Sequence, residues 1–218
     1  MSSKNAGTPE NRGAYMTAIM CMLINDHCNM TRIINTLERQ TSSLDHEEAV
    51  DLGLIKNILE YLLDYPTRVH HPVEDLVYGK LKIRDPAMAR TLDDLEQEHA
   101  DLENQTRQFA LAVERVLKGE NLPPQELART GRDLTDRLQR HLATEETTLF
   151  PAARSSLMSS DWADIALVLG APDDPLFGPR LRDFYRRLHK EIMASGTAWA
   201  APPSPAVHDV PVVTPALA

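Results

Sequence analysis

AYMTAIMCMLINDHCNMTRIINTL, residues 14–37, decides the fold of this 218-residue chain. Its apolar positions recur at alternating spacings of four and three, and one histidine stands among them: Met16, Met20, Leu23, His27, Met30, Ile34 and Leu37. This spacing puts all seven side chains on one face of an α-helix, and that face must pack against other helices. The segment therefore predicts a long amphipathic helix with a histidine on its buried face.

Three further segments repeat this pattern, and each places one histidine on its apolar face: His70, His99 and His141. No run of alternating polar and apolar residues indicates a strand, and turn-forming residues separate the segments at 41–45, 84–86 and 119–124. Pro66 and Pro72 are expected to bend or interrupt the second helix. The sequence thus predicts an all-α fold, an up-down-up-down four-helix bundle with a short C-terminal helical extension.

The domain boundaries follow from composition. We expect the bundle to cover residues 14–155 and the helical extension to cover 156–195. The ends, 1–13 and 196–218, are polar or rich in proline and alanine, and we expect them to be disordered. The extension is expected to pack on the bundle or on a neighbouring chain, which makes it a candidate homodimer interface.

Charge and cysteine content restrict the partners and the compartment. The chain has 23 Lys and Arg against 32 Asp and Glu, a net charge of −9, which argues against nucleic acid and membrane partners. Two cysteines, Cys21 and Cys28, do not make a disulfide framework, so we expect buried free thiols in a cytoplasmic protein. No nucleophile elbow, phosphate-binding glycine loop or CxxC pair supports another catalytic class.

The four histidines are expected at one height. In an antiparallel pair of helices, residues at equal height have their sequence midpoint in the connecting turn. The midpoints of successive histidines fall near residues 48, 84 and 120, which lie in or next to the predicted turns. All four imidazoles are therefore predicted to project into the bundle at the same level.

Two glutamates complete this layer, because Glu74 follows His70 and Glu145 follows His141 by four residues, on the same helical faces. Burying imidazoles and carboxylates without partners is costly, and a metal site removes that cost. Imidazole with bridging carboxylate suits iron or manganese. We expect the neighbouring Asp75 and Glu146 to be solvated charges. His71 is expected to be exposed, and the alternative is that it supports the metal ligands from behind.

Four motifs carry a resemblance to a known family: DHCN at 26–29, HHPVED at 70–75, QEHADL at 97–102 and HLATEETTLFPA at 141–152. Over residues 14–155 the chain resembles the hemerythrin-like, HHE cation-binding domains. The resemblance implies two non-heme iron ions joined by an oxo or hydroxo bridge. It implies the terminal ligands His27, His70, His99 and His141 and the bridging carboxylates Glu74 and Glu145.

The chain departs from the oxygen-carrying hemerythrins at two positions. Glu103, four residues after His99, stands where they have a further histidine. Glu146, five residues after His141, stands where they have an aspartate. In this chain the carboxylate at the spacing of four from His141 is Glu145, which fits the bridging position instead. We expect oxygen to oxidise the reduced centre of this protein instead of loading reversibly. Glu103 is a candidate additional ligand.

The resemblance implies a di-iron protein that binds or senses a small diatomic ligand, oxygen or nitric oxide. The alternative is a di-iron enzyme that reduces peroxide or that supplies iron and repairs iron centres. A structural bundle without metal is a third reading.

Overall fold

The computed structural model describes residues 9–45, 49–92, 94–169, 174–179 and 181–194, and within them every regular element is helical. The expected all-α class is thereby confirmed for this part of the chain. The predicted disordered tail, 196–218, and residues 1–8 lie outside the described residues.

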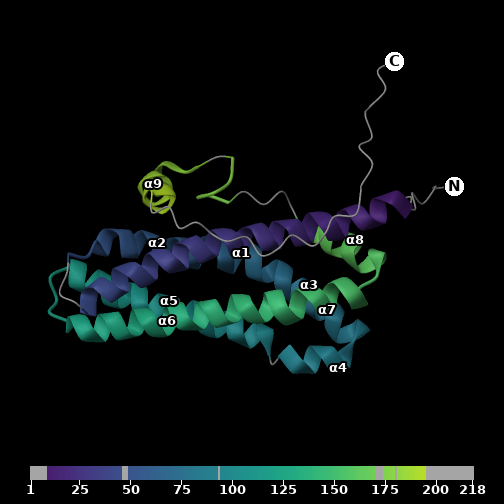
Figure 1. Cartoon of the computed structure of the whole chain (residues 1–218), viewed down its shortest axis with the longest axis horizontal. Helices are drawn as coiled ribbons and strands as arrows, with labels where there is room; N and C mark the ends of the chain where they lie inside the picture. The colour runs from purple at the N-terminus through teal and green to yellow at the C-terminus, as the bar shows by residue number, and fades with distance from the viewer. Residues whose placement is uncertain (1–8, 46–48, 93, 170–173, 180, 195–218) are drawn as a thin grey trace, which may run out of the picture.

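Four long helical runs make up most of the chain (Figure 1). The first is α1, Pro9–Asp45. The second comprises α2 (Leu52–Tyr65), the π-helix η1 (Pro66–His70) and α3 (His71–Arg84). The third is α5, Leu95–Leu117, which follows the short elements α4 (Pro86–Ala89) and η2 (Arg90–Leu92). The fourth comprises α6 (Pro124–Thr144), the π-helix η3 (Glu145–Leu149) and α7 (Phe150–Ser156).

Two expectations about helix boundaries need correction. Helix α1 begins at Pro9, so residues 9–13 are helical where we expected disorder. Proline is tolerated there because the first turn of a helix needs no amide donor. Pro66 does not interrupt the second run either: it opens a π-helix, in which the His71 amide donates to the Pro66 carbonyl, and α3 continues directly.

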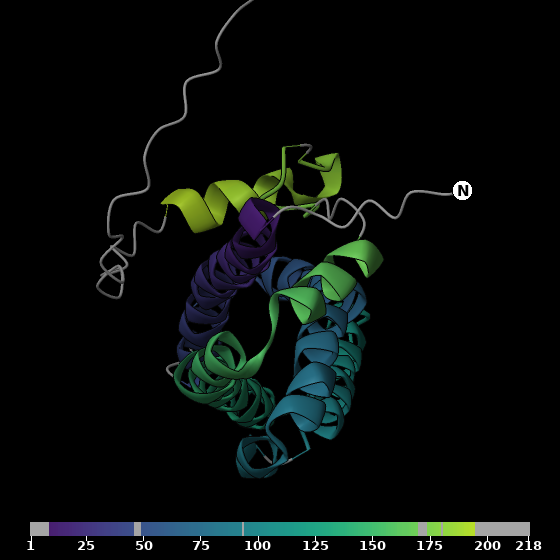
Figure 2. The same ribbon diagram turned by 90° about the vertical axis from the view of Figure 1, so that its right-hand side faces the viewer.

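The apolar core consists of two clusters, and a polar layer separates them. On α1, His27 stands between Leu23 of one cluster and Met30 of the other. On α5, His99 stands in the same way between the apolar residues of the two clusters. The helices pack as α1 on α6, α2 on α5 and α5 on α6, and the end view shows them arranged around this interior (Figure 2).

The C-terminal extension packs on the same chain. It contains α8 (Ser159–Val168), η4 (Asp183–Tyr185) and α9 (Arg186–Ala194). Helix α8 lies against α1, and Arg84 donates two hydrogen bonds of 2.8 and 2.9 Å to Asp161. Helix α9 crosses the long helices, contacts α1 and α2 and buries Leu188 and Ile192 (Figures 1 and 2). A homodimer through this extension remains a prediction.

Both cysteines lie on α1 and are free, but they are not buried as expected. Cys21 is exposed and Cys28 is half-buried. Each immediately follows a buried residue, Met20 and His27 respectively, and one residue turns a helix by about 100°.

In the described part of the chain, no helix combines the length and the apolar character that crossing a membrane requires.

Gly131 permits the close approach of α6 to α1. A Cβ atom at this position would lie 2.2 Å from Thr41 Cγ2 and 3.0 Å from Phe109 Cζ. Replacing Gly131 by alanine is therefore expected to lower the free energy of unfolding by about 1–2 kcal/mol, because overpacking outweighs the gain in helix propensity. Urea denaturation measures the difference.

The chain supplies a matched control for this substitution. A Cβ atom at Gly79 of α3 meets nothing within 4 Å, so Gly79→Ala is expected to be neutral or stabilising. Thr41→Ser removes the nearest methyl group and should partly restore the stability of Gly131→Ala. An unchanged stability of the single variant Gly131→Ala would contradict the close approach.

Candidate metal centre

The polar layer contains every side chain predicted to form it. His27 comes from α1, His70 from the end of η1, Glu74 from α3, His99 from α5, His141 from α6 and Glu145 from the start of η3. All six are buried. The ring centres of His27 and His70 are 5.0 Å apart and those of His99 and His141 are 4.9 Å apart. Four helical runs therefore converge on one small volume.

Glu74 lies between two sets of imidazoles. Its Oε1 atom is 3.1 Å from His27 Nε2 and 3.1 Å from His70 Nε2. Its Oε2 atom is 3.6 Å from His99 Nε2, on the other side. One carboxylate thus faces both halves of the layer, which is the position of a bridging ligand.

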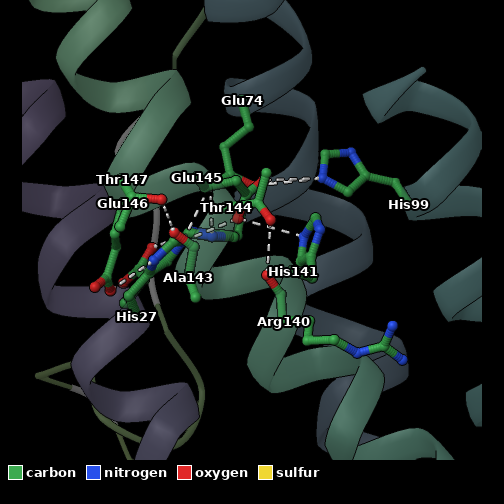
Figure 3. A network of polar contacts seen from close by, with 12 residues as sticks. His27, Glu74, His99, Arg140, His141, Ala143, Thr144, Glu145, Glu146 and Thr147 are labelled. Atoms are coloured by element: carbon green, nitrogen blue, oxygen red, sulfur yellow. Dashed lines mark hydrogen bonds and ion pairs between the residues drawn. The ribbon is translucent and has the colours of Figure 1, made fainter. Parts of the chain in front are cut away.

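Glu145 has an equivalent position (Figure 3). Its Oε2 atom is 3.4 Å from His27 Nε2 and 3.3 Å from His141 Nε2, and its Oε1 atom is 3.4 Å from His99 Nε2. Glu145 begins the second π-helix, just as His70 ends the first. Single π-turns inside α-helices occur frequently at functional sites, because they change which side chains face inward.

Three outer carboxylates hold the imidazoles in orientation through their Nδ1 atoms. The pairs are His27 with Glu146 at 3.1 Å, His70 with Asp26 at 3.1 Å and His99 with Asp75 at 2.9 Å. Such contacts fix the ring and leave Nε2 free to point inward, as is usual for histidines that bind metals. We expected Asp75 and Glu146 to be solvated charges; they are partly exposed, but each also contacts a histidine of the layer.

A tyrosine hydroxyl group holds one of these outer carboxylates in place. Tyr65 donates a hydrogen bond of 3.2 Å to Asp26 Oδ2, the atom that also contacts His70. Asp26 was not among the predicted site residues. The signal available in the sequence was its place directly before His27, in the motif DHCN.

His71 is buried, and our expectation that it would be exposed was wrong. Its ring stacks on that of His99, with centres 4.2 Å apart and planes 6° apart. The reason lies in the backbone: the π-turn that ends at His70 is wider than an α-helical turn, and two successive histidines face the interior.

Several atoms at the middle of the layer are buried without a hydrogen bond. They are His70 Nε2, Glu74 Oε2, His141 Nε2 and Glu145 Oε2. His70 Nε2 and His141 Nε2 lie 3.1 and 3.3 Å from carboxylate oxygens of Glu74 and Glu145, but without hydrogen-bond geometry. An unsatisfied buried polar group costs about 1–3 kcal/mol, so this arrangement is expensive unless another species occupies the middle.

The donor atoms fit two metal positions. The ligand atoms of His71, Glu74, His99 and His141 lie within 4.8 Å of one another, and so do those of His27, His70 and Glu74. Glu74 belongs to both groups. Nitrogen and carboxylate donors in this ratio match the known inward-facing Glu and His sites of helical di-metal proteins.

Without metal, the layer holds protons instead. Burial disfavours a charged His70, but Glu74 and Asp26 outweigh it and raise the pKa of His70 to about 10. Burial acts in the same way on His99, yet its contacts with Asp75 and Glu145 raise its pKa to about 9. Burial, together with the charge of Glu74, raises the pKa of Glu145 to about 7.

His141 behaves differently from the other histidines. Burial and the positive charge of neighbouring histidines lower the pKa of His141 to about 3, so its ring is neutral at pH 7. Neutral imidazole is the form that binds metal ions. His141 is therefore ready to bind a metal without losing a proton.

Glu103 lies at the edge of the layer. Its carboxylate pairs with Arg107, one turn further along α5, and it belongs to neither group of potential ligands among the described residues. Coordination by Glu103 remains a prediction. Glu103 does line a small internal cavity of about 20 Å³, roughly enough for one molecule the size of water.

The cavity lies between apolar side chains and the polar layer. Its polar lining comes from Thr67, His71, Glu103, Thr106 and His141, and Met30, Ile34, Leu102 and Leu142 contribute to its apolar lining. Outside the layer, an open depression of about 670 Å³ reaches His141 from the solvent, lined among others by Arg137, Arg140 and Thr144. The centre is thus approached by a small cavity with mostly apolar walls and by a surface depression lined mainly by polar residues.

A comparison with protein-family models matches residues 21–153 to the hemerythrin HHE cation binding domain. The matched range includes all six predicted ligands, together with Asp26, His71, Asp75 and Glu146. It ends before the C-terminal extension. No curated protein and no solved structure matches the chain.

Proposed function

Because the chain belongs to the hemerythrin HHE cation-binding family, we propose that its histidine and carboxylate layer holds two iron ions in a carboxylate-bridged, non-heme centre. The observation that carries this proposal is the position of Glu74 and Glu145, each between two sets of imidazoles. The packing of α1 on α6, α2 on α5 and α5 on α6 supports an up-down-up-down four-helix bundle around it.

The ligands divide between two positions. His27 and His70 would hold one iron, and His99 and His141 would hold the other. Glu74 and Glu145 would be the carboxylates shared by both, and an oxo or hydroxo group would add a donor to each. Iron bound in this way supplies redox chemistry and a position for a small ligand.

We propose that the ligand is oxygen or nitric oxide, which the protein binds or senses. The small cavity beside His71 and His141 supports this choice, because its size and its mostly apolar walls suit an uncharged diatomic molecule. The outer carboxylates hold the imidazoles in place, and leucines and a methionine line the cavity. The net charge of −9 argues against nucleic acid and membrane partners, and the two free cysteines support the proposal that the protein is cytoplasmic.

The alternative is a di-iron enzyme that reduces peroxide or supplies iron. The open depression at His141 favours it, because polar walls admit a polar substrate. Within the depression Arg137 is held by Glu98, at 2.8 and 2.6 Å, and by Asp101 at 3.0 Å. Among the described residues, Arg140 makes one side-chain hydrogen bond, to a backbone carbonyl of its own helix. Arg140 is the residue best placed to attract an anion.

The first test is the metal content. Elemental analysis of the purified, reconstituted protein is expected to give about two iron atoms per chain, as one di-metal site requires. Fewer than one iron atom per chain, with folding intact, would favour the structural bundle without metal. Anaerobic titration of the reduced protein with nitric oxide, oxygen and peroxide then separates the diatomic ligand from the peroxide reaction.

A further inference from the structure

We infer that His71 is a fifth imidazole ligand, on the same metal as His99 and His141. The two metals are then unequal, with three imidazoles on one and two on the other. This inference deepens the proposed function and rests on the proposed iron centre.

The geometry of the rings supports the assignment. A nitrogen of His71 lies within 4.8 Å of the donor atoms of Glu74, His99 and His141. The ring centre of His71 is 4.2 Å from that of His99 and 5.8 Å from that of His141, and the latter two are 4.9 Å apart. The donor nitrogens of three imidazoles from three helical runs therefore lie close to the carboxylate of Glu74. Because the lone pair of an imidazole lies in the ring plane, the parallel rings of His71 and His99 must turn relative to one another for both to bind one metal.

His71 has no other structural role of comparable strength. Each of the rings of His27, His70 and His99 is held by an outer carboxylate, whereas within the described residues no hydrogen bond to the ring of His71 is found. No carboxylate therefore fixes the orientation of the His71 ring. A metal ion next to His99 would hold it in place.

The assignment has a consequence for ligand access. His71 and His141 both line the small cavity. Removing His71 is expected to open a coordination position toward the cavity.

The test counts imidazoles on iron in the full-length protein. X-ray absorption of the iron-loaded protein is expected to give an average of about two and a half imidazoles per iron, falling to about two in His71→Ala. Mössbauer spectra should change for one of the two irons only. A chelator should remove iron from the variant about tenfold faster or more, since a ligand is lost.

Two variants and one addition keep the test interpretable. His71→Phe keeps a flat ring against His99 but has no donor nitrogen, so it should reproduce the spectra of His71→Ala even if the smaller side chain destabilises the fold. Added imidazole should restore the spectrum of His71→Ala. His189→Ala, a half-buried histidine of α9 that contacts Phe177, should leave every iron signal unchanged.

The outcomes separate the inference from the proposed function. A wild-type protein with less than one iron per chain would refute both. Two irons per chain, with identical resting spectra in wild type, His71→Ala and His71→Phe, would refute only the coordination by His71. If such variants changed only the nitric oxide adduct, His71 would face a bound ligand and not the metal, and the inference would again be wrong.

Discussion

Replacing Glu74 by alanine is expected to remove most of the bound iron and to lower the free energy of unfolding by about 3–5 kcal/mol. The residue is fully buried and contacts His27, His70 and His99, which belong to three different helical runs. Its loss removes a bridging ligand and leaves buried imidazoles without a countercharge. Iron analysis and thermal denaturation measure the two effects.

Two control variants sharpen this experiment. Glu74→Gln keeps the volume and one oxygen, so it should lose iron with a smaller loss of stability. Glu96→Ala removes an exposed glutamate whose partner is Lys82, and it should keep both iron and stability. Retention of two irons and an unchanged melting temperature in Glu74→Ala would show that Glu74 is not a ligand.

The metal-free protein is expected to lose stability as the pH rises from 7 to 9, and the iron-loaded protein is not. The folded-state pKa values of His70 and His99, about 10 and about 9, lie above their unfolded value of 6.5. In this window the folded chain holds protons that the unfolded chain has released, so each pH unit lowers stability, by roughly 1–3 kcal/mol. Bound iron takes the place of these protons.

Urea denaturation at pH 7, 8 and 9, with and without iron, tests this difference. His99→Gln should reduce the pH dependence of the metal-free protein, because one of the two titrating groups is removed. A metal-free protein whose stability is constant or increases over this range would show that the two histidines do not hold protons in the folded layer.

The metal layer was predictable because its signals are local and periodic. The helical spacing of apolar residues predicted which face of each segment is buried. The positions of the turns predicted that His27, His70, His99 and His141 lie at the same height in the bundle. The spacing of four placed Glu74 and Glu145 on the same faces as two of these histidines. The structure brings all six side chains together.

The outer shell was not predictable in the same way. Asp75 directly follows the predicted ligand Glu74, and Glu146 directly follows the predicted ligand Glu145. In a regular α-helix, a residue next to an inward-facing one points its side chain away from the interior. Each nevertheless contacts a histidine on another helical run, across a distance in sequence of 24 and 119 residues respectively. Such contacts depend on how neighbouring helices are rotated about their axes, and spacing along one helix does not contain that information.

The sequence by itself thus determined the all-α class and the common height of the four histidines and two glutamates, because both follow from helical periodicity and turn positions. Only the tertiary structure decided the inward position of His71. A π-turn at Pro66–His70, which begins at a proline that lacks an amide, changes the rotation of the helix at that point. Periodicity assumes a constant turn, so it misplaced His71, the residue that directly follows this π-turn.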